Sequence, residues 1–292
     1  MNNDLKVRSS SAETTLRSMH AGDVAAMHGL AQQMSWPHRP EDCAQLLALG
    51  AGTVAVDPTG LTVGVGLRWS FGRDVGTIGL VLVAPERQGR GIGRALMKAL
   101  IADSEPRTLM LNATAEGLPL YEKLGFVSTG FVRQHQGRLA EGAVLPAAPN
   151  APLRRAVPTD RAQLCALDAA VFGADRSALI GTLLASGDAW LVDCGGQPTG
   201  FAVLRAFGRG MIIGPVVASS EDDAIALVAA AAKAAPTGVL RIDIPAHAEG
   251  LAAWLTAAGL PAIDTVTVML RGSWPATGQG PQRFGLALQA WG

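Results

Sequence analysis

The alternation of apolar and polar positions predicts two helices followed by a run of strands. Val24, Met27 and Leu30 recur at the spacing of an amphipathic helix, which predicts a helix over 21–33. A second helix is predicted over 40–49. After Gly50 the pattern changes to short β-branched runs separated by Gly, Pro and Asp turn signals. These runs predict three consecutive strands, over 53–56, 62–69 and 77–83.

A glycine-rich loop follows the third of these strands. Ala84-Pro85 ends the strand, and apolar positions at helical spacing resume in a helix predicted over 94–102. The order strand, glycine loop, helix is typical of sites that bind phosphate groups. Further along, the pattern predicts a strand over 107–111, a short helix over 118–124 ended by Gly125, and a strand over 126–133.

The middle of the chain has the composition of a linker. Between residues 136 and 156, Pro146, Pro149 and Pro152 stand among Ala and Gly. A length of 292 residues is also comfortable for two units of ordinary size. We therefore expect two domains, 1–145 and 146–292.

The second half repeats the first at a steady offset. The matches, which lie 134 to 137 positions apart, are Leu16-Arg17-Ser18 plus Asp23 with Leu153-Arg154-Arg155 plus Asp160, Val83-Ala84 with Val217-Ala218, and Leu124-Gly125-Phe126 with Ala258-Gly259-Leu260. This offset predicts duplication of one fold. The glycine loop was not duplicated, because its counterpart is Ser219-Ser220-Glu221-Asp222-Asp223, and Tyr121 is matched by Leu255. We expect no equivalent anion site in the second repeat.

Composition and charge exclude several classes of function. Hydrophobic residues make up 49% of the chain, and Lys+Arg balance Asp+Glu at 24 each, without a basic, aromatic-rich stretch. A nucleic-acid partner is therefore not expected. The most apolar run, 216–235, is interrupted by charged residues, and the polar opening 1–11 lacks the apolar core of a signal peptide. We expect a cytoplasmic protein without a membrane segment. The scattered cysteines and histidines indicate no metal site.

The loop Gln88-Gly89-Arg90-Gly91-Ile92-Gly93 is the strongest single signal in the chain. Its glycines allow a tight turn that exposes backbone N–H groups at the start of the next helix. Arg87, Arg90 and Arg94 add positive charge, which favours a diphosphate over a neutral ligand. The spacing fits neither a dinucleotide G-x-G-x-x-G nor a P-loop. A glycine-rich turn without a ligand is the alternative.

Two motifs give the chain a resemblance to a known family. Residues 83–93 resemble the pyrophosphate-binding motif of the GNAT superfamily of acyl-CoA-dependent N-acetyltransferases, Q/R-x-x-G-x-G/A, filled here by Gln88, Gly91 and Gly93. The segment from Leu120 through Tyr121 to Leu124-Gly125-Phe126 resembles the second signature of the family. The resemblance covers roughly 15–132 and extends to two-lobed bacterial members. It implies an α/β (α+β) fold of tandem GNAT-like domains, each with a mixed, mostly antiparallel central sheet flanked by helices.

The resemblance also implies roles for individual residues, with acetyl-CoA as co-substrate. Tyr121 would protonate or hydrogen-bond the departing CoA thiolate, although aromatic packing is the alternative for this residue. The strand before the loop would pair its backbone with the pantetheine arm, and Asn112 would contact the pantetheine amides. The residues expected to bind the cofactor are Val81, Leu82, Val83, Gln88, Gly89, Arg90, Gly91, Ile92, Gly93, Arg94 and Asn112.

The general base is not assigned, because residues 77–83 contain no carboxylate where many members of the family place a glutamate. His38, Glu41 and Asp42 are candidates, and a proton path through water is the alternative. Met34, Trp36 and Pro37 would form an apolar entrance for the acceptor or pack in the core. The leading hypothesis is direct acetyl transfer to a primary amine of a small molecule or peptide. The competing hypothesis is a non-catalytic acyl-CoA-binding regulatory protein.

The role of the second repeat is open at this point. It could cover the acceptor cleft, dock as a structural half, or bind a second ligand. Trp254, Trp274 and Trp291 are large apolar groups expected to build the interface between the lobes. The oligomeric state is expected to be a monomer or a homodimer.

Overall fold

The computed structural model describes residues 14–139, 144–276, 278 and 280–292. The elements predicted from the first half are present with ends shifted by a few residues. Helix α3 begins at Ile92 rather than at residue 94, because Gly91 (φ 82°) is its N-cap residue. The elements are β1 (Thr15–Ser18), η1 (Ala21–Asp23), α1 (Val24–Gln33), α2 (Pro40–Ala48), β2 (Ala51–Val56), β3 (Thr62–Phe71), β4 (Val75–Val83), η2 (Pro85–Arg87), α3 (Ile92–Ala102), β5 (Thr108–Ala113), α4 (Leu118–Glu122) and β6 (Val127–Leu139).

The second half follows the same order of elements, except that η2 has no counterpart among the described residues, and it ends with one additional strand. Its elements are β7 (Leu153–Arg155), η3 (Pro158–Asp160), α5 (Arg161–Phe172), α6 (Ser177–Ser186), β8 (Asp188–Cys194), β9 (Gln197–Phe207), β10 (Gly210–Ala218), α7 (Glu221–Ala234), β11 (Gly238–Pro245), α8 (Glu249–Ala257), β12 (Ala262–Arg271) and β13 (Gln282–Gly285).

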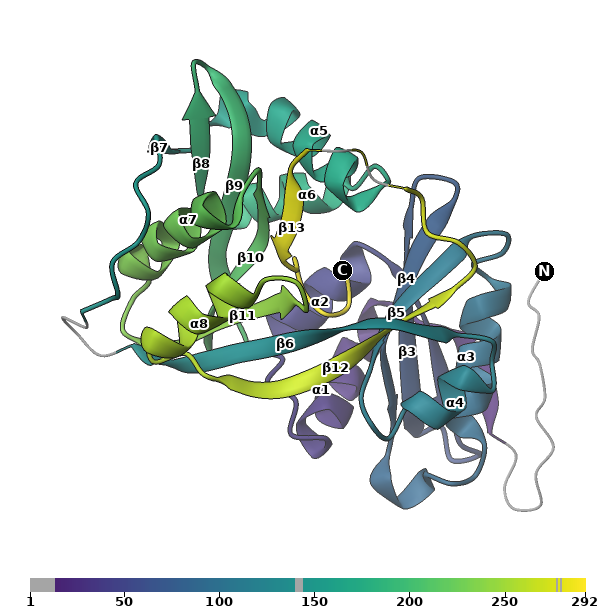
Figure 1. The fold of residues 1–292 in the computed structure, drawn as a ribbon. Helices are drawn as coiled ribbons and strands as arrows, with labels where there is room; N and C mark the ends of the chain where they lie inside the picture. The colour runs from purple at the N-terminus through teal and green to yellow at the C-terminus, as the bar shows by residue number, and fades with distance from the viewer. Residues whose placement is uncertain (1–13, 140–143, 277, 279) are drawn as a thin grey trace.

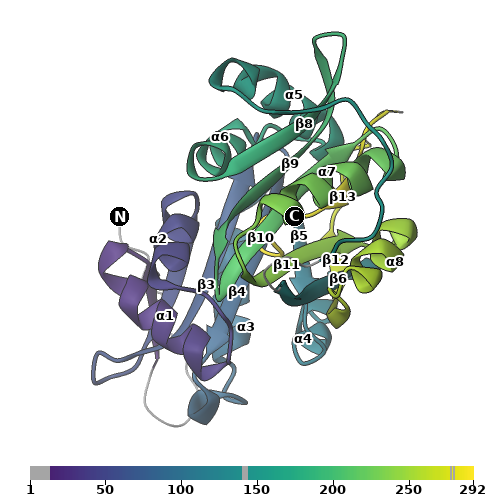
Figure 2. The ribbon, with the colours of Figure 1, turned by 90° about the vertical axis from the view of Figure 1, so that its left-hand side faces the viewer.

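The strands of both halves form one 13-stranded sheet, in the order β1-β2-β3-β4-β5-β12-β6-β11-β10-β9-β8-β7, with β13 paired to β10 (Figure 1). The pairings are antiparallel except for β4 with β5 and β10 with β11. Figure 2 shows α1 and α2 along the strands of the first half and α5 and α6 along those of the second. The predicted class, a mixed and mostly antiparallel sheet flanked by helices, is confirmed.

Each half contributes one long strand to the other half of the sheet. Strand β12 pairs with β5, with Thr267 opposite Ala113, and β6 pairs with β11, with Leu139 opposite Gly238. The two strands also pair with each other and cross the middle of the molecule side by side (Figure 1). The prediction that the strand ends at residue 133 was wrong, because β6 finds hydrogen-bonding partners on β11 as far as Leu139. The predicted linker therefore loses residues 136–139, and residues 140–143 lie outside the described part. The boundary near residue 145 stays a prediction.

The repeat is visible in a matched ion pair. Arg17 donates to both carboxylate oxygens of Asp23 at 2.8 and 2.7 Å, and Arg154 donates to both oxygens of Asp160 at 2.8 Å. In each case the aspartate also accepts a backbone N–H three residues before it. The same local construction at the same place in both halves supports the predicted duplication.

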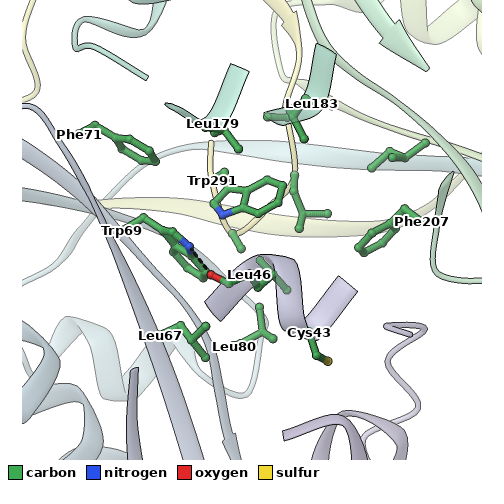
Figure 3. Packing of buried hydrophobic residues seen from close by; sticks show 14 of the residues in the cluster. Cys43, Leu46, Leu67, Trp69, Phe71, Leu80, Leu179, Leu183, Phe207 and Trp291 are labelled. Atoms are coloured by element: carbon green, nitrogen blue, oxygen red, sulfur yellow. Dashed lines mark hydrogen bonds between the residues drawn. The ribbon is translucent and has the colours of Figure 1, made fainter. Parts of the chain in front are cut away.

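Large apolar side chains from both halves share one core. Trp291 stands edge-on to Trp69, with ring centroids 6.3 Å apart, beside Leu179 of α6 (Figure 3). The indole of Trp69 donates to the carbonyl of Leu46 at 3.0 Å, which satisfies its buried N–H. Trp291 thus lies where an inter-lobe residue was expected, whereas Trp254 packs in a different cluster, with α7 and β11, so the expectation was wrong for Trp254.

Candidate active site

Strands β4 and β5 pair for only a short distance and then separate. Their parallel ladder joins Val75–Thr77 to Thr108–Met110, whereas β4 continues to Val83 and β5 to Ala113. On the other edge of β4 the register with β3 shifts, and Leu80 has a φ of 48°. The separation leaves backbone N–H and C=O groups of the end of β4 facing a gap, where a ligand can pair with them.

The glycine loop presents free amides at the end of this gap. Gly89 and Gly91 have φ values of 73° and 82°, and a Cβ built at either position would meet no heavy atom within 4 Å. The amide of Ala95, bonded to the carbonyl of Gly91 at 3.0 Å, begins the hydrogen bonds of α3. Within the described residues, the amides of Ile92, Gly93 and Arg94 have no acceptor. Open space in front of unpaired amides at a helix N-terminus fits an anionic ligand.

The polar side chains around the loop differ in whether the protein itself supplies them with a partner. Arg90 and Arg94 are exposed, but Arg87 binds the carboxylate of Asp57 at 2.8 Å, which offsets its charge. The expected contribution of Arg87 to the positive charge at the loop is therefore reduced. Gln88 donates to the carbonyl of Val83 at 3.2 Å and so ties the loop to the end of β4.

The apolar residues of this region support the backbone and face away from the gap. Leu82 and Ile92 are buried, and Val81 and Val83 are partly buried in apolar clusters beside α3. A Cβ built on Gly93 would lie 3.7 Å from Leu120 and equally close to Val83, so α3, β4 and α4 meet there. Any contact of these four residues with a ligand would be made by their backbone groups.

Tyr121 lies on α4, and the preceding residue, Leu120, lies next to Gly93 of the glycine loop. Its ring is partly buried and stands edge-on to Phe126, with centroids 6.2 Å apart. A Cβ at Gly117 would come within 2.8 Å of the ring, so the glycine makes room for it. Burial raises the pKa of Tyr121 to about 12, because desolvation disfavours the phenolate. No hydrogen bond of the hydroxyl occurs within the described residues, so the phenol is a protonated donor without an internal acceptor.

A cavity of about 380 Å³ opens where β4 and β5 separate. The described residues include two non-glycine residues with positive φ, Ser35 and Leu80, and both line this cavity. Strained backbone of this kind tends to cluster at functional sites. The lining residues from the first half of the chain are Ser35, Trp36, Pro37, His38, Ile78, Gly79, Leu80, Asn112, Thr114 and Gln134.

The second half of the chain forms the rest of the cavity wall. It contributes Phe207, Arg241, Ile263, Asp264, Val266, Leu288, Gln289 and Ala290. Of the roles left open for this repeat, the geometry supports two: it covers the cleft of the first half, and it docks as a structural half through the shared sheet and core. No motif pointed to these residues, because they come together only through tertiary pairing: they lie on β9, on β11, on β12 and in the last described segment.

The last described segment is fixed to the strands around the cavity by hydrogen bonds to its carbonyls. Thr77 donates to Ala290 at 2.8 Å, Asn112 to Gln289 at 2.6 Å, and Arg205 to Ala287 at 2.8 Å. Asn112 therefore uses one of its two amide N–H groups within the protein, and its Oδ1 is buried without a partner among the described residues. It lies in the cavity wall, and its contact with pantetheine stays a prediction.

The three candidates for the general base are separated by the fold. His38 is buried and lines the cavity, and its pKa is lowered to about 4, first by burial and then by the charge of Arg241, so it is neutral at pH 7. Asp42 accepts hydrogen bonds from the Arg39 guanidinium at 2.6 and 3.1 Å and from the Gly208 amide at 2.9 Å. Glu41 is exposed and lies outside the cavity lining. Only His38 among the three has access to the cavity.

The expected apolar entrance is formed in part. Trp36 and Pro37 line the cavity, but Met34 lies elsewhere, with its sulfur 3.9 Å from Nε2 of Gln88 beside the loop.

The corresponding gap in the second half is filled by the protein itself. Strands β10 and β11 pair as far as Ile213 and Ile242, after which β13 pairs with β10 at Val216–Ala218. Gly214 occupies the position that matches Leu80, and a Cβ there would overlap the carbonyl oxygen of Leu286. At the start of α7, Ser220 accepts the amide of Asp223 at 3.1 Å. A ligand would have to displace β13 to enter.

Comparison with known proteins assigns both halves to one family. Models described as "Acetyltransferase (GNAT) domain" match residues 40–140 and 164–285. The chain is 32% identical over 240 residues to the Uncharacterized N-acetyltransferase YitH of Bacillus subtilis strain 168, covering 80% of this chain and 82% of that protein. The chain belongs to the GNAT acetyltransferase family. The predicted family and enzyme class are confirmed, and members of this family use acyl-CoA and act on amine acceptors.

Solved structures share the fold across both halves. A provisionally assigned acetyltransferase of Pyrococcus horikoshii superposes with a TM-score of 0.77 at 20% identity, covering 96% of each chain. A tandem GNAT protein from the clavulanic acid biosynthesis pathway superposes with a TM-score of 0.65 at 16% identity, covering 89% of this chain and 99% of that one. Among the described residues, no helix is both long and apolar enough to cross a membrane.

Proposed function

We propose that the first half of the chain binds acetyl-CoA in the gap between β4 and β5 and transfers the acetyl group directly to a primary amine held in the 380 Å³ cavity. The observation that carries this proposal is the continuity of three features: free amides at Ile92–Arg94, unpaired backbone at the end of β4, and a cavity lined by Ile78, Gly79 and Leu80.

Each feature suits one part of the co-substrate. The loop amides, with exposed Arg90 and Arg94, fit the diphosphate, because N–H groups at a helix N-terminus bind anions. The backbone of Val81, Leu82 and Val83 fits the amide groups of a pantetheine arm. Acetyl-CoA supplies an activated acyl thioester to this site.

The protein groups near the cavity support acyl transfer without a covalent intermediate. A neutral amine forms the C–N bond, the C–S bond breaks, and the thiolate takes one proton. Tyr121 holds a proton that it can give to the thiolate, since its raised pKa keeps the phenol protonated. The ammonium form of the amine first loses one proton to solvent, which makes the amine neutral. A second proton leaves the nitrogen as the amide forms, and this proton returns the Tyr121 phenolate to the phenol. Amides near Leu80 can stabilise the developing oxyanion.

Release of CoA thiol in the presence of an added amine tests this proposal. Purified protein with acetyl-CoA should release thiol only when an acceptor amine is present, and the amine should gain one acetyl group by mass spectrometry. Binding of CoA without amine-dependent release across a broad amine panel would instead indicate a binding protein without turnover. Protein that becomes acetylated by acetyl-CoA alone and then passes this acetyl group to an added amine would contradict direct transfer.

A further inference from the structure

We propose that the acceptor is a small amine that also carries a carboxylate, and that Arg241 binds this carboxylate at the wall of the cavity. This inference rests on the function proposed above and names the substrate class for the same site. Four observations carry it: the face on which Arg241 lies, its unused donors, the charge around it, and the size of the cavity.

Strand β11 and the two exchanged strands β6 and β12 present one polar face to the cavity. In the sheet register Arg241 is opposite Gln136, Asp243 is opposite Gln134, and Gln134 is opposite Asp264. Opposed residues, and residues two apart on a strand, point to the same side of a sheet. Arg241, Gln134 and Asp264 all line the cavity, so the face shared by β11, β6 and β12 is one of its walls.

Arg241 has donors that the protein does not use. Its Nε and Nη2 donate to the two oxygens of Asp243 at 3.0 and 2.8 Å. Its Nη1 has no acceptor within the described part of the chain. The residue is 7% exposed, so water has little access to it. A guanidinium with free N–H groups in such a wall is a strong site for a carboxylate.

Near Arg241 the three arginines Arg39, Arg205 and Arg241 face two buried carboxylates, those of Asp42 and Asp243, while a third carboxylate, that of Asp264, is exposed at the cavity wall. Asp42 is bound by Arg39 and Asp243 by Arg241, whereas Arg205 has no carboxylate partner among the described residues. The guanidinium carbons of Arg205 and Arg241 each lie 5.6 Å from the centroid of the Phe207 ring. The buried charge of Arg205, next to the ion pair of Arg241 with Asp243, favours an anion on this side of the cavity.

Two further features point to a ligand of modest size with its own polar groups. His38 is buried, lines the cavity and has an Nδ1 without a partner. Trp36, Leu288 and Val266 give the cavity apolar walls. A volume of about 380 Å³ accommodates an amino acid with an apolar side chain. The exposed carboxylate of Asp264 at the cavity disfavours acceptors with a second carboxylate.

Matched acceptor pairs test this inference on the unmodified protein. Phenylalanine is compared with phenylalaninamide, and 6-aminohexanoate with pentylamine, with rates referred to the fraction of neutral amine. The carboxylate-bearing member of at least one pair should show a kcat/KM about tenfold or more higher, as expected for a charge-assisted hydrogen-bonded pair. Equal or higher kcat/KM for the uncharged member of both pairs would overturn the proposal.

A substitution at Arg241 tests whether this residue causes the preference for a carboxylate. Arg241→Lys keeps the charge but loses the planar fork, and should reduce the preference for the carboxylate about tenfold, mainly through a higher KM. Arg138→Lys, at an exposed position of β6 outside the cavity lining, is the matched control and should retain the preference. An unchanged preference in Arg241→Lys would overturn the assignment.

The outcomes separate the inference from the function on which it rests. If no amine is acetylated, the proposed transferase activity fails. If amines are acetylated without regard to a carboxylate, the activity stands and the carboxylate site is refuted. If Arg241→Lys does not fold, the acceptor pairs measured on the unmodified protein still decide the substrate class.

Discussion

Replacing Tyr121 by phenylalanine removes one hydroxyl and leaves the surrounding packing in place. The ring keeps its edge-on contact with Phe126, and the space made by Gly117 remains filled. No described residue bonds to the hydroxyl, so its loss leaves no buried partner unsatisfied. The free energy of unfolding should therefore change by no more than about 0.5 kcal/mol.

The expected effect on catalysis is much larger. General acid catalysis contributes roughly 10²–10⁴-fold, so kcat with a saturating amine should fall by about a hundredfold or more in Tyr121→Phe. Since each tenfold loss corresponds to about 1.4 kcal/mol in the activation barrier, this is a loss of about 3 kcal/mol or more. Thiol release measured at saturating acetyl-CoA gives kcat, and urea unfolding gives the stability of the same preparation.

The pH profile of the unmodified enzyme gives a second readout. Because burial raises the pKa of Tyr121 to about 12, the phenol stays protonated from neutral pH to about pH 10. The amine, by contrast, becomes neutral as the pH rises through this range. Activity should therefore increase toward pH 10, without an alkaline decline caused by Tyr121.

An unchanged kcat in Tyr121→Phe would refute the role of this hydroxyl as proton donor. A change in KM alone would show that the hydroxyl contributes to binding and not to the chemical step. Tyr121→Leu, which also removes the ring, serves as the comparison and should lose stability as well as activity.

Two further substitutions test how the fold is held together, one beside the cavity and one in the second repeat. Thr77→Val removes the buried hydrogen bond to the carbonyl of Ala290 and should lower the free energy of unfolding in urea by about 1–3 kcal/mol, whereas an unchanged value would mean that the carbonyl finds another donor. Arg154 lowers the pKa of Asp160 from 3.8 to about 2, so the ion pair stabilises the fold above the higher value and this contribution is lost as the pH falls from 3.8 toward about 2. Over that pH interval the free energy of unfolding of Asp160→Asn should decrease less than that of the unmodified protein. An equal decrease would contradict the stabilising role of the ion pair between Arg154 and Asp160.

Local patterns in the sequence predicted the glycine loop and most elements of the first half, although they missed strand β1. These predictions succeeded because apolar periodicity, Pro and Gly determine the conformation of the backbone close to them in sequence. Ala84-Pro85 and Gly91 are examples. The repeat was also visible, since Arg17 with Asp23 and Arg154 with Asp160 are short-range pairs. The family resemblance came from the loop and from the segment around Tyr121, both of which are contiguous in sequence.

The cavity could not be predicted in the same way, because tertiary pairing builds it. Arg241 and Asp264 come together only through the pairing of β11, β6 and β12. The composition of residues 136–139 suggested a linker, but hydrogen bonding to β11 overrides that local preference. Segment 286–292 likewise shows no motif, and its place is set by donors such as Thr77 and Asn112, far away in sequence.

Calorimetric titration with coenzyme A tests the central claim most directly, because the account depends on a diphosphate held by the amides after Gly91. The unmodified protein should show saturable binding, and Gly91→Glu should abolish it by placing a carboxylate in the open space before α3. Gly196→Glu is the matched control, since Gly196 also has positive φ (87°) and open surroundings but lies in the turn between β8 and β9. Saturable binding lost in Gly91→Glu and kept in Gly196→Glu is the predicted result. No saturable heat with the unmodified protein, or equal affinity in Gly91→Glu, would contradict the account.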